Sequence, residues 1–65
     1  MIQITEHQWL GATELIESLL IAEFEEPGME AADLFIFMDT VLPLRTLELV
    51  EQFFDAGFGK GNWEY

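Results

Sequence analysis

The sequence contains no cysteine and only two basic residues, Arg45 and Lys60. Without cysteine it can form neither a disulfide nor a thiolate-ligated zinc site. Its longest uninterrupted apolar run, Leu34 to Met38, is far shorter than the roughly 20 residues of a membrane-spanning helix. Residues 1–6 contain no basic segment followed by a long apolar core, so we expect no signal peptide. These absences predict a soluble intracellular protein.

Hydrophobic residues, by contrast, make up 51% of the 65 positions. This fraction argues against a disordered chain, because disorder combines high net charge with low hydrophobicity. We expect one small acidic domain over residues 1–65, near the lower size limit for independent folding. So small a body cannot bury all of its apolar side chains. The remainder predict a dimer or a surface that contacts a partner.

The charge is strongly one-sided, since 13 residues are acidic and the formal net charge is −11. Mutual repulsion of this size destabilises a compact state. A net charge of about 2–8 in magnitude is already enough to keep a small domain soluble. The additional negative charge therefore indicates a functional role. Nucleic acids and anionic membranes are polyanions and are disfavoured as direct partners. The one-sided charge therefore favours a partner protein with a basic surface.

Helical signals begin at Thr5 and Gln8, whose capping-box spacing predicts a helix start near Glu6. Gly11 lowers the stability of a helix interior by ~1 kcal/mol relative to alanine. The first turn is therefore a candidate for a separate short helical segment. From Ala12 to Glu25 the helical period is clear, with Leu15, Ile16, Leu19 and Leu20 as its apolar stripe. The helix is expected to end before the pair Pro27-Gly28, which suits the centre of a type II turn.

The segment from Met29 to Leu42 is apolar on nearly all sides, which is typical of the buried centre of a bundle. A buried strand at Leu34 to Met38 is the alternative, because short apolar runs fit both structures. Pro43 predicts a break in the chain. Leu44 to Ala56 is the clearest amphipathic helix, and Gly57 suits its C-terminal cap.

These segments predict an all-α fold, a compact bundle of three to four helices. The N-terminal residues Met1 to Ile4 are expected to be irregular or extended, although a lone strand has no evident partner in the sequence. The glycine-rich tail after Gly57 is expected to be irregular, with Phe58 or Trp63 packed on the core.

Residues suited to catalysis are few. His7 is the single histidine and Ser18 the single serine. One histidine without cysteine cannot form an ordinary zinc site, and no second histidine is available to activate Ser18. We therefore predict no enzymatic activity, no metal site and no bound cofactor.

The acidic residues themselves are the candidate binding site. Like charges three and four positions apart on a helix destabilise it by ~0.2–0.5 kcal/mol per pair, and a carboxylate at a helix C-terminus opposes the helix dipole. Glu30 and Asp33 begin the second segment, where that dipole favours a negative charge, so they need no further explanation. The predicted partner-binding residues are Glu14, Glu17, Glu23, Glu25, Glu26, Glu48, Glu51 and Asp55.

The segment RTLELVEQFF, Arg45 to Phe54, is similar to the start of the second helix of acyl carrier proteins, which are also small, acidic and helical. That family attaches its prosthetic arm to a serine in an Asp-Ser-Leu sequence. The matching positions here read Arg45-Thr46-Leu47, so the attachment residue of that family is missing.

In size, charge, absence of cysteine and predicted helicity, the whole chain resembles small phage-encoded inhibitors that mimic DNA, including anti-restriction and anti-CRISPR proteins. The resemblance includes no sequence motif. It implies a monomer or homodimer in the cytoplasm of a bacterial host, occupying the DNA-binding surface of a CRISPR effector, such as a type I Cascade complex, or of a restriction enzyme. The alternative is a structural or regulatory interaction module, antitoxin-like or an assembly partner, that binds through exposed aromatics such as Trp63 or Tyr65.

If the carboxylates repel one another, added salt should stabilise the isolated protein, because the Debye length falls from ~10 Å at 0.1 M to ~3 Å at 1 M ionic strength. We expect the melting temperature to rise steadily through a sodium chloride series followed by circular dichroism. A melting temperature that does not respond to salt would mean that the charges are too dispersed to repel.

Overall fold

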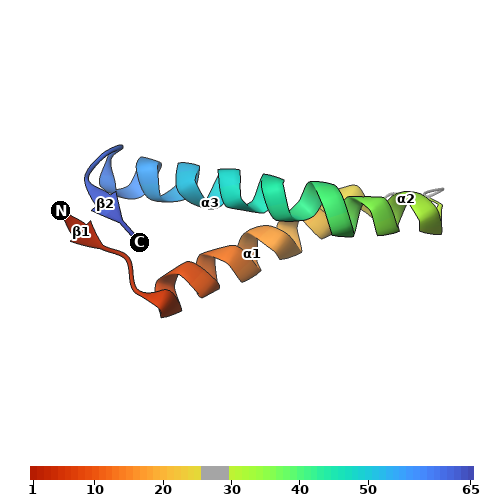
Figure 1. Ribbon diagram of the computed structural model, residues 1–65, viewed down its shortest axis with the longest axis horizontal. Coiled ribbons are helices and arrows are strands. Elements are labelled where there is room, and N and C mark those ends of the chain that lie inside the picture. Colours follow the sequence, from red (N-terminus) through yellow and green to blue (C-terminus); the bar gives the residue numbers. More distant parts are fainter. Residues whose placement is uncertain (26–29) are drawn as a thin grey trace.

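A computed structural model describes residues 1–25 and 30–65, which form a long helical hairpin closed at one end by a two-stranded sheet (Figure 1). The predicted Pro27-Gly28 turn and the candidate Glu26 lie outside these residues. The described elements are β1 (Ile2–Gln3), α1 (Glu6–Phe24), α2 (Ala31–Ile36), the π-helical turn η1 (Phe37–Val41), α3 (Leu42–Phe58) and β2 (Trp63–Glu64). The body measures 45 × 18 × 15 Å.

The first arm of the hairpin, α1, begins with the predicted capping box. The Thr5 hydroxyl accepts from the Gln8 amide at 3.1 Å, and the Gln8 side chain accepts from the Thr5 amide at 2.9 Å. These two bonds satisfy donors that a helix start would otherwise leave free. The helix passes through Gly11 without a break, so the prediction of a separate first turn was wrong. Its C-terminal cap is Glu25, as the Pro27 signal had indicated.

The second arm is one continuous helical run, because η1 lets α2 lead directly into α3. The Leu42 amide donates to the Phe37 carbonyl, five residues back rather than four. Pro43 has no amide hydrogen, and in a regular α-helix its ring would clash with the carbonyl of Asp39. The wider turn just before Pro43 gives the ring room at the start of α3. Pro43 therefore ends no helix, contrary to the sequence-based prediction.

The π turn also keeps the buried row of the second arm in register. Phe37, Leu42, Val50 and Phe54 are buried, as is Thr46. The first two are five residues apart and the rest follow at intervals of four. One extra residue in η1 thus rotates α2 so that Phe37 faces α1, where it stacks on Phe24 with ring centroids 3.8 Å apart.

The chain ends close the hairpin at its other extreme. β1 and β2 pair in parallel, with Ile2 opposite Trp63 and Gln3 opposite Glu64. The Ile2 amide donates to the Asn62 carbonyl at 2.7 Å, and the Ile4 amide donates to the Glu64 carbonyl at 2.8 Å. The extended N-terminus thus has a partner after all, in a tail that was expected to be irregular.

The largest core cluster lies beneath this small sheet. Ile4, Val50 and Phe54 are buried there, and Trp9, Ile16 and Trp63 pack against them. The indole of Trp9 stacks on Phe54 at 5.9 Å and on the Tyr65 ring at 4.6 Å between centroids. The prediction that Trp63 returns to the core is confirmed.

The predicted bundle of three to four helices was wrong: the described residues form two helical arms and a parallel two-stranded sheet. The physical reason is the π turn, which fuses two expected helices across Pro43. Leu34 to Met38 is helical rather than a strand, as favoured. It is not a buried centre, however, because Phe35 is 68% exposed and Ile36 57%.

Thr46 offers a test of the packing between the two arms. Its side chain is 3% exposed, and its hydroxyl has no hydrogen-bond partner among the described residues. A buried hydroxyl without a partner costs about 1–3 kcal/mol. Thr46→Val keeps the shape and removes that cost, so we expect urea unfolding to show a gain of about 1 kcal/mol. Thr46→Ser, which keeps the hydroxyl and loses a methyl group, should instead destabilise the protein.

Candidate functional site

The candidate acidic residues are distributed over several sides of the hairpin. Residues four apart form rows along a helix, and the row Leu42-Thr46-Val50-Phe54 of α3 faces α1. Glu51 and Asp55 belong to one neighbouring row, while Glu48 lies on the row that points away from α1. Glu48, Glu51 and Asp55 therefore lie on adjacent rows of α3, at spacings of three and four residues. We call these three residues the acidic ridge.

The candidates on α1 do not join this ridge as one patch. Glu14 lies on the exposed row of α1, which contains Leu10 and Ser18 and points away from α3. Glu17 is half-buried on a row shared with Trp9. Glu23 is exposed beside a groove that also contains Phe24 and Arg45. Glu25 is exposed at the end of α1.

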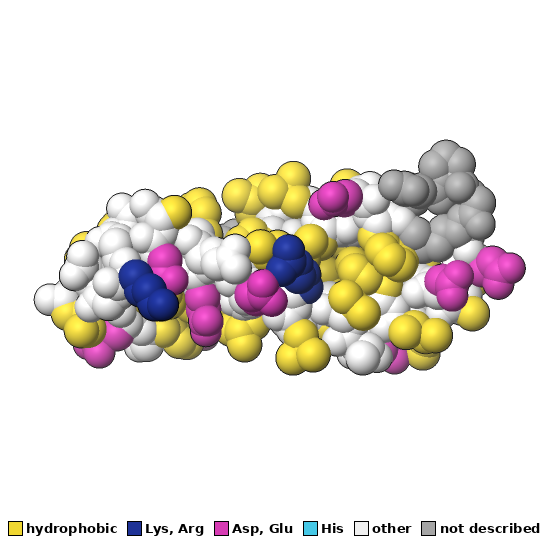
Figure 2. Space-filling view, turned by 90° about the horizontal axis from the view of Figure 1, so that it is seen from above, with side chains coloured by type: hydrophobic (Ala, Val, Ile, Leu, Met, Phe, Trp, Pro, Cys, Tyr) yellow, Lys and Arg dark blue, Asp and Glu magenta, His cyan; other side chains and the backbone are white. Residues whose placement is uncertain are grey.

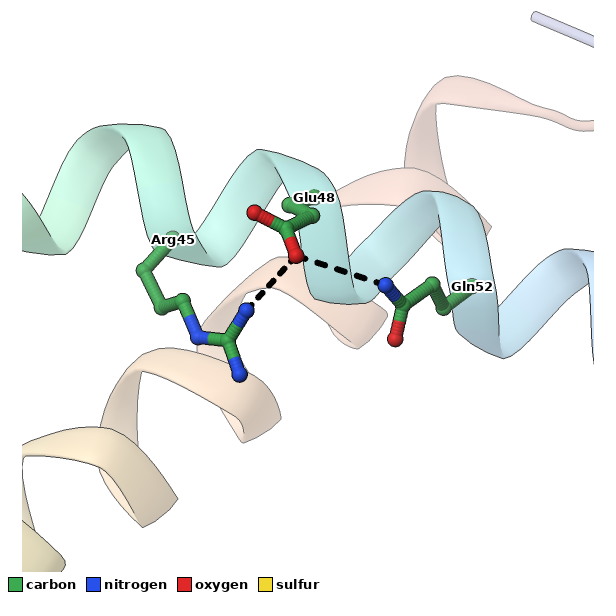
Figure 3. Close-up of polar contacts among 3 residues, drawn as sticks. All are labelled: Arg45, Glu48 and Gln52. Atoms are coloured by element: carbon green, nitrogen blue, oxygen red, sulfur yellow. Dashed lines mark hydrogen bonds and ion pairs between the residues drawn. The ribbon is translucent and has the colours of Figure 1, made fainter.

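Two members of the acidic ridge already have partners. The Glu48 carboxylate accepts from Arg45 at 2.6 Å and from Gln52 at 3.4 Å through the same oxygen (Figure 3). The Arg45 and Glu48 side chains are 48% and 55% exposed, so this pair contributes little to stability. Asp55 is half-buried and accepts from the Trp63 indole at 2.8 Å. Asp55 therefore has a structural function that its position in the sequence did not indicate.

Carboxylates outnumber basic side chains over the whole described surface. Of the twelve described Asp and Glu residues, ten are exposed and only Glu17 and Asp55 are half-buried. Figure 2 shows one face of the molecule, on which acidic side chains occur at several separate places among apolar and other side chains. On this face the acidic side chains form no continuous stripe.

Sequence reasoning missed the extent of the exposed apolar surface. Leu15 and Leu19 belong to the apolar stripe predicted for their helix, yet they are 58% and 61% exposed. Phe53 on α3 is 55% exposed. Hydrophobic periodicity reports that a face is apolar, and it does not report whether anything covers that face. One sequence signal could have indicated this exposure: the chain has more apolar residues than so small a core can bury.

The two residues considered for catalysis, His7 and Ser18, both lie on α1. His7 is exposed in the first turn of α1, and the Ser18 hydroxyl donates to the Glu14 carbonyl at 2.9 Å. In residues 1–25 and 30–65, no three His, Asp or Glu side chains are grouped to hold a metal ion. None of the described helices combines the length and apolarity that crossing a bilayer requires.

Comparisons with protein-family models, curated proteins and solved structures gave no significant match. The function therefore has to be argued from the surface itself.

Asp55 differs from the exposed candidate carboxylates because its side chain also stabilises the fold. Its hydrogen bond to Trp63 holds the C-terminal strand against Phe54, and hydrogen bonds to charged groups contribute about 1.5–3 kcal/mol. Because Asp55 is half-buried, we expect Asp55→Ala to lower the free energy of unfolding in urea by about 1–2 kcal/mol. Glu51→Ala, an exposed change on the same row, should alter it by less than about 0.5 kcal/mol. Equal effects of the two substitutions would contradict this assignment.

Proposed function

We propose that the protein is an inhibitor that occupies the basic nucleic-acid-binding surface of another protein in place of DNA. The observation that carries this proposal is the excess of 13 acidic over two basic residues, with ten of the twelve described carboxylates exposed. Such a surface attracts Lys- and Arg-rich sites and repels nucleic acid. It also speeds association with a positively charged cleft.

The acidic ridge supplies the most regular arrangement of charge. Glu48 and Asp55 are seven residues apart on α3, which places them about 10 Å apart along the helix axis at 1.5 Å per residue. One strand of DNA presents a phosphate every ~3.4 Å along its axis, so the length of the ridge corresponds to about three intervals between successive phosphates. A carboxylate has up to four acceptor positions, so Glu48 and Asp55 retain sites for a partner beyond the bonds they already make.

The class of target follows from the resemblance to phage-encoded DNA mimics. CRISPR effectors such as type I Cascade complexes, and restriction enzymes, bind DNA in channels lined by basic residues. They are the first targets to test, and the bacterial cytoplasm is where such an inhibitor would act.

A second candidate function is an interaction module that binds through apolar residues. Fourteen large hydrophobic side chains of the described residues are exposed, among them Phe35 and Leu44 at 68% and 71%. Of the aromatics first considered for this function, Trp63 packs against the core, whereas Tyr65 stacks on Trp9 and remains 61% exposed. Loss of Trp63 would therefore report on folding rather than on partner binding.

Charge reversal on the acidic ridge tests the proposed inhibitor. The double variant Glu48→Lys/Glu51→Lys places repulsive charges against a basic channel, so we expect affinity for the effector to fall roughly 100-fold. Binding of the wild-type protein should weaken steeply as salt is raised and should compete with target DNA. Binding and competition can be measured by fluorescence anisotropy with labelled DNA.

The matched control is Asp39→Lys/Glu64→Lys. Both of its positions are exposed and lie outside the predicted binding set, and the double change shifts the net charge from −11 to −7, as the ridge variant does. The control should lose far less affinity than the ridge variant. Simultaneous binding of DNA and this protein to one effector would contradict the proposal.

A further inference from the structure

The hairpin is only one layer of helices thick, whereas stable domains are built from at least two packed layers. Its radius of gyration is 13.9 Å, against about 11 Å expected for a compact domain of 65 residues. Its accessible surface is 4862 Å² for a mass of 7.5 kDa, and a folded monomer of that mass exposes about 4,250 Å². The chain therefore exposes about 600 Å² more surface than a compact monomer.

This surplus has the size that a dimer interface requires. Specific interfaces begin at about 1,200 Å² in total, or about 600 Å² from each partner. A second copy that covered the surplus on both chains would reach this lower limit and would supply the missing layer.

Four of the fourteen exposed large hydrophobic side chains lie in two rows on one side of the hairpin, along its two grooves. On α1, the row His7-Gly11-Leu15-Leu19-Glu23 borders the buried face. On the second arm, the row Val41-Arg45-Leu49-Phe53-Gly57 does the same. We call the side formed by these two rows the apolar flank. Its most exposed apolar members are Leu15, Leu19, Val41 and Phe53, between 47% and 61% exposed.

Two grooves show that the two rows meet on the same side. A groove of about 500 Å³ is bordered by His7, Gly11 and Leu15 from α1 and by Phe53 and Gly57 from α3. A second, of about 710 Å³, is bordered by Glu23 from α1 and by Val41 and Arg45 from the other arm. Members of both rows thus line each groove, one near the sheet and the other near the far end of the hairpin. Ridges of a second helical layer can pack into grooves of this kind.

Charge favours this flank over the remaining sides for contact between two copies. Each copy carries a net charge of −11, so two copies can associate only where carboxylates are sparse. The α3 row of the flank contains no acidic residue and includes Arg45, one of only two basic residues in the chain. The acidic ridge and Glu14 lie on other rows and stay exposed in such a dimer.

The same charges select a relative orientation. The flank is acidic at one end, where Glu23 and Asp33 border the larger groove, and has His7 near the other end. A two-fold axis parallel to the hairpin would bring the two acidic ends together. An axis that lies in the plane of the interface and runs across the long axis of the hairpin brings each acidic end to the opposite end of the other copy and avoids that repulsion.

We propose that the apolar flank binds a second copy of this chain, with the two hairpins antiparallel, to form a two-layer dimer. The interface is isologous, and its centre lies near Leu15, the middle of the five positions of the α1 row. This proposal does not depend on DNA mimicry, because it concerns the side of the molecule that lacks the acidic ridge.

Sedimentation equilibrium of the intact protein tests the dimer. Wild type should show a mass near 15 kDa, twice the 7.5 kDa of the chain, over a concentration series. Leu19→Lys, on the flank, should shift the mass to 7.5 kDa, while Leu10→Lys, on the outer row of α1, should leave it at 15 kDa. The two leucines are comparably exposed, at 61% and 49%, and both variants change the net charge equally. Circular dichroism confirms that each variant remains helical.

A wild type that stays monomeric at every soluble concentration overturns the proposal. So does a dimer that survives Leu19→Lys and is lost in Leu10→Lys, since another face would then form the contact. A monomer whose Leu19→Lys variant loses binding to a basic effector also overturns it and assigns the flank to a heterologous partner.

Cysteine cross-linking tests the orientation, because the chain has no cysteine of its own. Under mild oxidation, Leu15→Cys should form a covalent dimer on a non-reducing gel, since the two-fold axis passes close to it. His7→Cys, at the end of the same row, should remain monomeric. Cross-links that form as fast at His7→Cys as at Leu15→Cys would overturn the antiparallel arrangement.

Discussion

The contact between one row of side chains on the second arm and the inner face of α1 holds this fold together. Phe37, Leu42, Val50 and Phe54 are buried along it, between η1 and the C-terminal half of α3. The π turn before Pro43 accommodates the five-residue spacing from Phe37 to Leu42 in one wide turn. In a regular α-helix of the same sequence that spacing would turn Phe37 about 140° away from the row, and the ring of Pro43 would clash with the Asp39 carbonyl.

At the open end of the hairpin, the two chain termini cover the core, as a third helix would in a larger bundle. Ile4 and Trp63 cover Val50 and Phe54, and the paired strands satisfy the backbone groups that this burial requires. At the opposite end, the stacked rings of Phe24 and Phe37 hold the arms together. Between these clusters the arms have apolar sides that none of the residues 1–25 and 30–65 covers. Closure at both ends thus leaves the long sides of the hairpin available for interaction.

The acidic ridge and the apolar flank are formed by different rows of the two arms. The rows of the ridge also contain the exposed Leu44 and Leu47, while the two rows of the flank contain one carboxylate, Glu23. This separation lets one molecule use charge toward a basic partner and apolar area toward another copy. Each contact would then involve surface that the other leaves free. The separation also reduces the repulsion that a net charge of −11 would otherwise impose on any self-association.

The sequence by itself determined the helix start at Thr5 and the excess of negative charge, because capping and composition are local properties. It favoured a helix over a strand at Leu34 to Met38 without deciding between them. It also indicated the line of Glu48, Glu51 and Asp55, since positions on one helix follow from spacing alone. Only the tertiary structure decided that Pro43 is accommodated, because that depends on a π turn that aligns Phe37 with α1. Pairing of the two termini, the bond from Trp63 to Asp55 and the exposure of Leu15 and Leu19 were likewise decided there. Each depends on residues distant in the chain, and local periodicity carries no information about which apolar face another element will cover.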